Sequence, residues 1–301
     1  MAKSGLPAVR ACLFDMDGLL IDSEDIYTLC TNKVLNEYGK PDLPWNIKAQ
    51  LQGRPGPEAG RILREWAQLP ISQEEMYAKI SALQVEHFPK TKALPGVPQL
   101  LSTLSKATNP KVHLALATSS HKRNFEIKSA HLADLFSVFD EEHRILGDDP
   151  RIGAGRGKPA PDIYLLALET INARLRSAGE REIHPEECLV FEDSVPGVEA
   201  GRRAGMQVVW CPHPGLLNEY KGREKEVLAG LTGEHKDEED AGANVVENVQ
   251  DDVEGKEKRL HARIKGRPGE LDDGWAVLLN SLEDFDYEWF GIQTTAGAST
   301  L

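Results

Sequence analysis

Two carboxylates follow the first apolar run of the sequence, at a spacing that suits phosphate or metal chemistry. The run Val9–Phe14 stops at Asp15-Met16-Asp17-Gly18. In an extended segment, residues two apart point to the same side, so Asp15 and Asp17 would bring two negative charges together. That arrangement is unfavourable unless a cation binds there. The same spacing also occurs in ordinary surface loops, so the motif needs support from other positions.

A second acidic pair supplies that support. Glu192-Asp193 follows another short apolar run, Leu189–Phe191. If the two runs form neighbouring strands, the carboxylates of Asp15, Asp17, Glu192 and Asp193 converge, and their mutual repulsion calls for a divalent ion. Because all the ligands would be oxygen atoms, the sequence predicts Mg²⁺ rather than Zn²⁺.

Hydroxyl and cationic residues at two further positions suit a phosphate. Thr118-Ser119-Ser120 follows the apolar run Val112–Ala117, and its hydroxyl and backbone N–H groups could cradle a phosphate. Residues of these types also cap helices without any ligand. Lys158 precedes a predicted helix. A lone lysine is usually exposed, but beside four carboxylates and a phosphate it would be the balancing charge.

The glycine-rich run before Lys158 is not a nucleotide-binding P-loop. The run Gly153–Lys158 resembles one by eye. A P-loop needs Gly five residues before its Gly-Lys pair and Ser or Thr after it. Ile152 and Pro159 occupy those two positions, so we exclude this interpretation.

The elements that carry these residues alternate between buried strands and helices. This alternation predicts an α/β fold with a Rossmann-like, doubly wound parallel sheet, in which ligands bind beyond the carboxyl ends of the strands. A last strand and helix are expected after Trp275. The predicted strands are Val9–Phe14, Val112–Ala117, Leu189–Phe191, Val208–Cys211 and Ala276–Leu279, and the predicted core helices are Asp162–Leu175 and Val195–Ala204.

Two segments interrupt the alternation. Residues 22–93 contain helical patterns, among them Ile26–Tyr38 and Glu58–Ala67, and no strand pattern. We predict that they form a small α-helical cap inserted into a core made of residues 1–21 and 94–301. Residues from about 221 to 273 are rich in Glu, Asp, Lys and Gly with few aromatics, which predicts a disordered acidic insertion in the core.

Composition excludes several classes of protein. The net charge of −13 argues against a general nucleic-acid or anionic-membrane binder. No apolar stretch is long enough for a membrane span, and the first ten residues lack the apolar centre of a signal peptide. Cysteines 12, 30, 188 and 211 show no CxxC spacing, so reduced thiols are expected. We therefore expect a cytoplasmic monomer with a small-molecule partner.

The order of these motifs resembles the haloacid-dehalogenase-like superfamily. Asp-x-Asp, Thr/Ser, Lys and Glu-Asp run along the chain in the order of that superfamily's four signature motifs, and the helical insert is similar to the cap of the β-phosphoglucomutases and many sugar phosphatases. Outside Tyr220–Asp273, several stretches are similar to the pseudouridine-5′-phosphatases. These stretches are Leu116–Ser120, Leu146–Pro150, Gly157–Ile163, Cys188–Val209, Asn280–Phe285 and Phe290-Gly291.

The resemblance implies a role for each carboxylate. Asp15 would be the nucleophile that forms an aspartyl-phosphate. Asp17 would protonate the leaving oxygen and then take a proton from water, which requires a raised pKa. Mg²⁺ would be held by the Asp15 carboxylate, the Asp17 carbonyl and the Asp193 carboxylate, with Glu192 acting through water or supporting the direct ligands. The presence of Asp17 favours a phosphatase over a dehalogenase, which lacks the second aspartate.

The same resemblance assigns the phosphate-binding groups and leaves the substrate open. Thr118, Ser119 and Lys158 would bind the phosphoryl oxygens. The predicted activity is that of a phosphomonoesterase acting on a small metabolite, with pseudouridine 5′-phosphate ahead of a sugar or polyol phosphate. The cap would select the leaving group, and its residues Ser23, Glu24, Tyr27 and Arg54 are candidates for facing the site.

Two other functions stay open at this point. A phosphomutase would pass the phosphoryl group to a second hydroxyl, but β-phosphoglucomutases carry His where Tyr27 stands and Arg near Gly56. A non-catalytic binding protein of the same fold would be expected to have lost a motif carboxylate or the lysine, and all of them are present.

Overall fold

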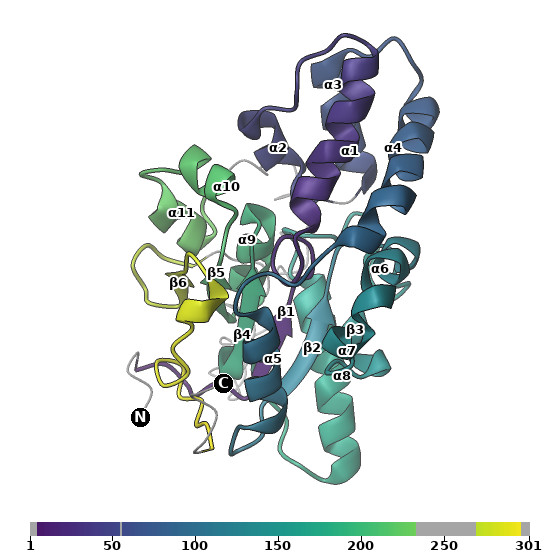
Figure 1. Ribbon diagram of the computed structural model, residues 1–301. Helices are drawn as coiled ribbons and strands as arrows, with labels where there is room; N and C mark the ends of the chain where they lie inside the picture. The colour runs from purple at the N-terminus through teal and green to yellow at the C-terminus, as the bar shows by residue number, and fades with distance from the viewer. Residues whose placement is uncertain (1–4, 55, 233–268, 296–301) are drawn as a thin grey trace, which may run out of the picture.

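A computed structural model describes residues 5–54, 56–232 and 269–295 of the chain (Figure 1). At its centre is a parallel sheet with the strand order β3-β2-β1-β4-β5-β6. The sheet grows outwards from β1 in both directions, so the predicted doubly wound α/β fold is confirmed. The strands are β1 (Ala11–Phe14), β2 (His113–Ala117), β3 (Arg144–Ile145), β4 (Cys188–Glu192), β5 (Gln207–Trp210) and β6 (Ala276–Leu278).

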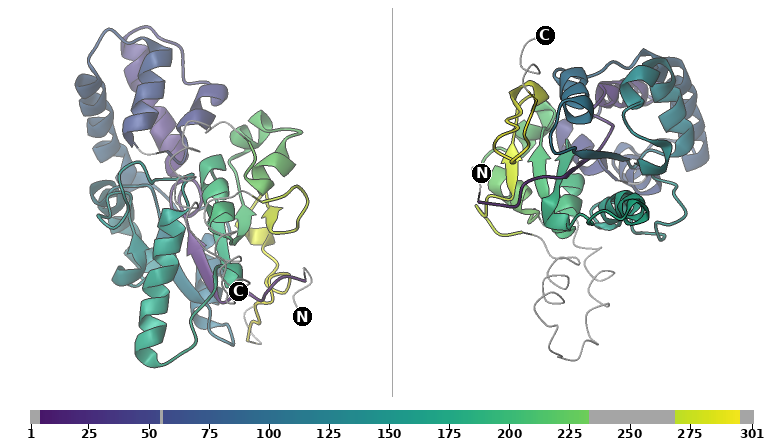
Figure 2. Two further views of the ribbon diagram at one scale, coloured as in Figure 1. Left: turned by 180° about the vertical axis from the view of Figure 1, so that it is seen from behind. Right: turned by 90° about the horizontal axis from the view of Figure 1, so that it is seen from below.

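Both faces of the sheet are buried under helices (Figure 2). Successive side chains of β1 alternate between two apolar clusters: Ala11 and Leu13 belong to one, Cys12 and Phe14 to the other. This explains why the strand is a continuous apolar run rather than an alternating one. Helices α8 (Asp162–Ala178) and α9 (Val195–Arg203) contribute to the first cluster, and α5 (Val97–Lys106), α6 (Lys122–Ser129) and α7 (Ala133–Phe136) to the second.

The strand register brings the chemical residues to one edge. Phe14 of β1 pairs with Leu116 of β2 and with Phe191 of β4. The Asp15 N–H continues this ladder by donating to the Phe191 carbonyl at 3.0 Å. Since parallel strands end at the same edge, the residues that follow β1, β2 and β4 meet there.

Between β1 and β2 the chain forms a separate helical cap above that edge (Figure 1). The cap has its own small core, which includes Val34, Leu63 and Met76. Two chain segments join it to the sheet domain side by side: the Leu94 N–H donates to the Leu20 carbonyl at 3.1 Å. Its helices are α1 (Ser23–Glu37), α2 (Trp45–Leu51), α3 (Gly56–Ala67) and α4 (Gln73–His87).

The prediction that residues from about 221 to 273 form a disordered insertion is wrong at both ends of that range. Residues 221–232 include helix α11 (Glu224–Ala229), whose Val227 is fully buried, next to α10 (Pro214–Glu219). Asp273 forms an ion pair with Arg202 of α9. Apolar burial and this ion pair hold both ends against the core, which a count of polar residues does not reveal. Residues 233–268 lie outside the described residues.

The remaining departures from expectation are small. In place of a final helix, the described chain after β6 forms a 3₁₀ turn (Leu282–Asp284), beyond which Phe285 and Phe290 stack with ring centroids 5.2 Å apart. Strand β3 was not predicted because two residues carry no periodicity. Further 3₁₀ turns are Phe88–Lys90, Ala130–Leu132, Glu141–His143 and Pro185–Glu187.

The cysteine and membrane predictions can be compared directly with the structure. Cys12, Cys30 and Cys188 are buried, Cys211 is half-buried, and all four carry free thiols, as expected. Among the described residues, no helix has both the length and the apolar character needed to cross a membrane.

Candidate active site

Lys158 joins the ends of β1 and β4 through two buried carboxylates. Its Nζ donates to Asp15 Oδ1 at 2.5 Å, to Glu192 Oε1 at 2.7 Å and to the Ala117 carbonyl at 3.1 Å. Tyr164 of α8 also donates to Glu192, at 2.5 Å. Lys158 is 1% exposed and Glu192 is fully buried, so this ion pair lies out of water. The sequence-predicted residues Asp15, Lys158 and Glu192 therefore do meet.

Burial and crowding make this group electrostatically unusual. Burial raises the pKa of Asp15 to about 7; Lys158 opposes the rise, while Glu192 and Asp17 add to it. Burial also raises the pKa of Asp193 well above its ordinary value, with Glu192, Glu24 and Asp15 adding to the effect. For Lys158, burial favours the neutral amine, but Asp15 and Glu192 outweigh it and raise its pKa. One lysine does not neutralise the acidic groups around it.

The donor set fits a divalent cation with oxygen ligands. Carboxylate oxygens of Asp15, Glu192 and Asp193 lie within 4.8 Å of one another. Both oxygens of Glu192 already accept hydrogen bonds: Oε1 from Lys158 and Tyr164, Oε2 from the Ser194 hydroxyl and from backbone N–H groups. Asp15 and Asp193 are therefore the better placed to hold Mg²⁺, which prefers carboxylate oxygen.

The fourth carboxylate lies apart from this cluster. The four-carboxylate convergence predicted from sequence is wrong for the Asp17 side chain, which is absent from the three-residue group. Asp17 instead binds Lys128 of α6, whose Nζ lies 2.5 Å from Oδ1 and 2.6 Å from Oδ2. Ser23 and Ser120 donate to Asp17 at 2.6 Å each.

The raised pKa expected for Asp17 is not found either. Burial alone would raise it, but the Lys128 ammonium and the hydroxyls of Ser120 and Ser23 hold it below its ordinary value. Lys128 was not predicted from the sequence. Its only signal was position: Lys128 lies three residues after the buried Phe125, on the apolar face of α6.

Thr118-Ser119-Ser120 forms the turn after β2. Thr118 is fully buried, and its Oγ1 accepts from the Ser120 N–H at 3.1 Å. Helix α6 begins only at Lys122, and its N-cap is His121, which makes no side-chain capping bond. The helix-capping interpretation of these three residues is therefore wrong, and they are left to line the cavity.

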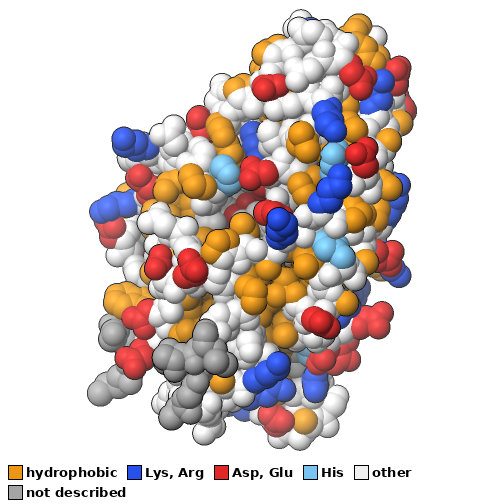
Figure 3. Space-filling view, viewed as in Figure 1, with side chains coloured by type: hydrophobic (Ala, Val, Ile, Leu, Met, Phe, Trp, Pro, Cys, Tyr) orange, Lys and Arg blue, Asp and Glu red, His pale blue; other side chains and the backbone are white. Residues whose placement is uncertain are grey.

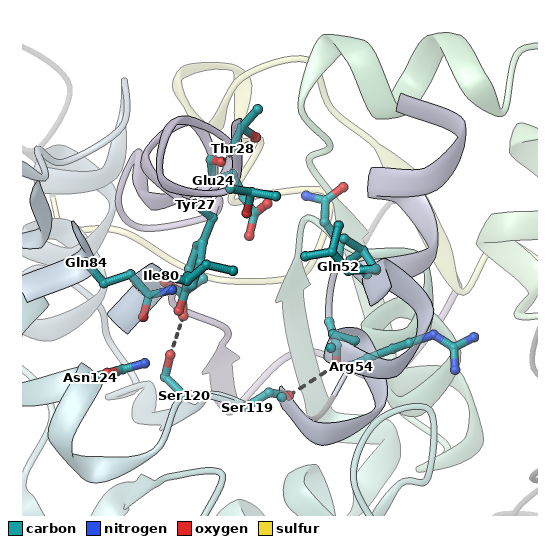
Figure 4. Close-up of a pocket in the computed structure, with 18 of the residues that line it drawn as sticks. Glu24, Tyr27, Thr28, Gln52, Arg54, Ile80, Gln84, Ser119, Ser120 and Asn124 are labelled. Carbon is teal, nitrogen blue, oxygen red and sulfur yellow. Dashed lines mark hydrogen bonds between the residues drawn. The ribbon is translucent and has the colours of Figure 1, made fainter. Parts of the chain in front are cut away.

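A cavity of about 460 Å³ opens above this edge of the sheet, between cap and core. On the face shown in Figure 3, acidic side chains gather at the level where the two parts meet. Figure 4 shows polar side chains entering the cavity from both sides. They come from the cap (Glu24, Tyr27, Thr28, Gln52, Gln84) and from the core (Ser119, Ser120, Asn124), whereas Arg54 lines the cavity with its guanidinium pointing away from the centre.

Two glycines permit the close approach of cap and core. Gly18 of the core has φ +76°, and a Cβ there would lie 2.7 Å from the Glu24 side chain of the cap and 2.3 Å from the Asp193 carboxylate. Gly53 has φ +74°, and a Cβ there would lie 2.5 Å from Ser194 Oγ. Any side chain would push the two parts apart. The Gly53 carbonyl also accepts from the Ser119 hydroxyl at 3.2 Å, which links the cap loop to the turn after β2.

The cap residues proposed from sequence all lie near the site, in different roles. Ser23 supports Asp17, and Tyr27 lies 3.3 Å from Lys128 Nζ. The carboxylate of Glu24 pairs with Lys48 at 3.5 Å, and the guanidinium of Arg54 pairs with Glu58. Glu24 and Arg54 thus line the cavity with their charges already partnered.

Sequence reasoning also missed Gln52, which enters from the loop after α2. Its Nε2 donates to Asp193 at 3.3 Å. Its Oε1 is buried and has no hydrogen-bond partner among the described residues. The side chain therefore presents an unused acceptor beside the acidic cluster.

Comparison with known proteins places the chain. Residues 9–205 match the model of the haloacid dehalogenase-like hydrolase family. A Saccharomyces cerevisiae protein named a probable pseudouridine-5′-phosphatase is 47% identical over 223 residues, covering 74% of this chain and 90% of the yeast protein. The Arabidopsis thaliana mitochondrial (DL)-glycerol-3-phosphatase 1 is 34% identical over 233 residues, covering 77% of this chain and 73% of that protein.

A solved structure agrees with this placement. The haloacid dehalogenase family hydrolase from Deinococcus radiodurans, solved with bound phosphate and sodium, is 28% identical with a TM-score of 0.50, and the match covers 69% of this chain and 82% of that one. The family match spans β1 to α9, so it includes Asp15, Thr118, Lys158 and Asp193. The chain belongs to the haloacid dehalogenase-like hydrolase family and is a phosphatase.

Proposed function

We propose that the chain is a Mg²⁺-dependent phosphomonoesterase that works through an aspartyl-phosphate on Asp15. The observation that carries the proposal is the buried contact of Asp15 with Lys158 and Glu192 at the floor of the cavity. A nucleophilic carboxylate next to a fixed ammonium can meet a phosphate dianion without prohibitive repulsion. Bound Mg²⁺ would supply further positive charge at the transferring phosphoryl group.

The reaction would have two steps on this chain's residues. Asp15 Oδ attacks phosphorus, the bond from phosphorus to the ester oxygen breaks, and Asp17 gives its proton to that oxygen. Water then attacks the aspartyl-phosphate while Asp17 takes its proton back, which releases phosphate and restores Asp15. Lys158, the Thr118 hydroxyl and the Ser119 N–H would hold the phosphoryl oxygens throughout.

The lowered pKa of Asp17 fits this scheme once substrate is present. In the structure Lys128 favours the ionised form of Asp17. A phosphate dianion bound beside Asp17 acts in the opposite direction, because a neighbouring negative charge raises a carboxyl pKa. The proton needed by the leaving oxygen would therefore be taken up with the substrate.

For the substrate, we propose a nucleoside-type 5′-phosphate, with pseudouridine 5′-phosphate first. Apolar cap residues Leu63, Met76 and Ile80 line the cavity together with Tyr77. Its volume of about 460 Å³ is within the usual range for small-molecule sites and exceeds what a three-carbon polyol fills. The unused acceptor of Gln52 would suit a hydroxyl of the leaving group. The yeast relative's name supports the same choice.

A sugar or polyol phosphate is the second candidate, since the Arabidopsis relative is named for glycerol 3-phosphate. The deciding measurement is phosphate release from pseudouridine 5′-phosphate, uridine 5′-phosphate, glycerol 3-phosphate and hexose phosphates on one preparation. Pseudouridine 5′-phosphate should lead in kcat/KM by about tenfold or more, the effect of one strengthened hydrogen bond. A glycerol or hexose phosphate in the lead would overturn the substrate while leaving the phosphatase chemistry standing.

The metal requirement is tested by chelation. Excess chelator should abolish activity and Mg²⁺ should restore it, whereas Ca²⁺ should support turnover poorly because its larger, looser shell misplaces the nucleophile. Full activity in excess chelator would contradict the proposed cofactor. We further propose a cytoplasmic monomer, in keeping with the free thiols; a dimer by sedimentation would contradict the second part.

A further inference from the structure

Lys128 is a fully buried lysine that belongs to no recognised motif. It lies on α6 in the core, 111 residues from Asp17 in sequence, and its side chain is 0% exposed. Its Nζ contacts both oxygens of Asp17 at 2.5 and 2.6 Å, Ser120 Oγ at 2.5 Å and Tyr27 Oη at 3.3 Å. Aromatic rings of Tyr27 and Phe88 lie over it, each with the centroid 5.3 Å away.

This environment makes Lys128 dependent on Asp17. Removing an ammonium from water is costly unless it is paired and its N–H groups are satisfied. Among the described residues, only Asp17 carries the opposite charge at hydrogen-bond distance from Nζ. Ser120 and Tyr27 are neutral hydroxyls, and the two rings contribute cation–π contacts. Asp17 raises the pKa of Lys128 to about 12 against the opposing effect of burial. The ammonium therefore stays charged and fixes the carboxylate.

Asp17 in turn is the member of the pair that faces the cavity. Asp17 lines the cavity and its side chain is 15% exposed, whereas Lys128 does not reach the cavity surface. Lys128 is thus placed to act on bound substrate only through Asp17. Ser23 and Ser120 hold the same carboxylate from two other directions, so its orientation is set by four contacts.

We propose that Lys128 is a positioning residue that aims the Asp17 carboxyl group at the leaving oxygen. The inference rests on the proposed role of Asp17 as the acid. When Asp17 hands its proton to the departing oxygen, a negative charge remains on Asp17, and the Lys128 ammonium stabilises it without giving up a proton. In the second step Asp17 regains a proton from water while Lys128 is again unchanged.

A leaving-group comparison tests the proposal. Benzyl phosphate has a poor leaving group that needs an acid, whereas p-nitrophenyl phosphate, of similar size, has a good one. In Lys128→Met, kcat/KM for benzyl phosphate should fall at least about tenfold more than kcat/KM for p-nitrophenyl phosphate, because general acid catalysis is worth roughly 10²–10⁴-fold when fully lost. In an Asp17→Asn background, Lys128→Met should cause no further selective loss.

A second buried cation provides the matched control. Arg202 is 6% exposed and pairs with Asp273, away from the cavity lining. Arg202→Met should lower the melting temperature but leave the ratio of the two kcat/KM values unchanged. A structural role alone for Lys128 predicts the same unchanged ratio in Lys128→Met, and that result would overturn the proposal.

A second variant tests the proposal if Lys128→Met cannot be obtained as a folded protein. If Lys128→Met does not fold, Lys128→Arg keeps the charge but replaces a compact ammonium by a larger planar group, which displaces the carboxylate. The same selective loss on benzyl phosphate is then expected, and an unchanged ratio rejects the proposal. Failure of the proposed function looks different, since the wild-type protein would then release no phosphate from either ester.

Discussion

Two lysine–carboxylate pairs border the same cavity, and they differ in what holds them. Lys158 binds Asp15 and Glu192 at the ends of β1 and β4, and the strand register sets the positions of these two carboxylates. Lys128 binds Asp17 in the turn that leads into the cap, with Ser23 and Tyr27 of α1 completing the contacts. The side of the proposed nucleophile, Asp15, is thus built by the sheet, while the side of the proposed acid, Asp17, is shared between core and cap.

The difference has a chemical meaning. Attack on phosphorus needs a fixed carboxylate whatever the ester, and a sheet edge provides it. Protonation of the leaving oxygen depends on which leaving group is bound, and in the proposed function the cap would hold that part of the substrate. We therefore expect substitutions on the nucleophile side to affect all esters alike and substitutions on the acid side to discriminate among them.

The largest effect should come from Asp15→Asn. The amide keeps the shape of the side chain but lacks the attacking charge, so phosphate release from every ester should fall to background. An inorganic phosphate assay on the purified variant measures this. If the variant kept a tenth or more of the wild-type rate, Asp15 would not be the nucleophile. The role assigned to the Asp15–Lys158 side of the cavity would then be wrong.

Lys158→Met should follow, with a loss of about 10²–10³-fold in kcat/KM, the usual effect of removing a group that stabilises transition-state charge. Because Lys158 contacts the nucleophile and not the acid, benzyl and p-nitrophenyl phosphate should lose activity equally. Side-by-side kinetics on the two esters check this. A loss of kcat/KM confined to benzyl phosphate, which has the poorer leaving group, would show that Lys158 and Lys128 act in the same way.

Asp273→Asn probes a cation–carboxylate pair outside the cavity lining. The change leaves the buried Arg202 without its charged partner, which should cost roughly 1–3 kcal/mol of unfolding free energy. Kinetics on both esters should stay unchanged. Arg202 is also among the groups that hold the pKa of Asp273 below its ordinary value against the effect of burial.

The pH dependence of that effect has a definite sign. A carboxyl group with a lowered folded-state pKa contributes stability above its unfolded pKa of about 3.9, and the contribution is lost as the pH falls through the folded value. The difference in melting temperature between wild type and Asp273→Asn should therefore have its full size at neutral pH and should disappear at pH values below 4. A difference that persisted there would show that the ion pair is not its cause.

The smallest effect is expected from excising residues 234–267. The segment is acidic and far in sequence from every motif, and its described flanks are close: the Gly269 N–H donates to the Ala229 carbonyl at 2.7 Å. With a short Gly-Ser bridge, kcat/KM should stay within a few-fold, because loop length changes closure entropy little. A large loss of kcat/KM in a folded deletion variant would show that the active site includes more than the two lysine–carboxylate pairs.

Much of the nucleophile side could be predicted from the sequence. Asp15, Thr118, Lys158 and Glu192-Asp193 each follow a recognisable strand or precede a helix, and parallel strands bring such positions to one edge. The core strands were predicted to within about two residues because continuous apolar runs mark strands buried on both faces. The two-residue strand Arg144–Ile145 had no such signal.

The acid side could not be predicted in the same way. Lys128 lies on α6 and Gln52 in the loop after α2, and neither belongs to a motif. The spacing of Lys128 from Phe125 is a weak local signal, and Gln52 has none. The ordered ends of the acidic insertion were missed for a similar reason, since Val227 is buried by contacts with distant parts of the chain.

The sequence by itself determined most of the core elements and which edge of the sheet carries the proposed nucleophile, because apolar periodicity and the order of motifs are local properties. Only the tertiary structure decided that Asp17 turns from the other carboxylates to Lys128, and that Gln52 meets Asp193. Those contacts join residues more than a hundred positions apart, and their energies depend on burial that exists only after the cap has packed onto the core.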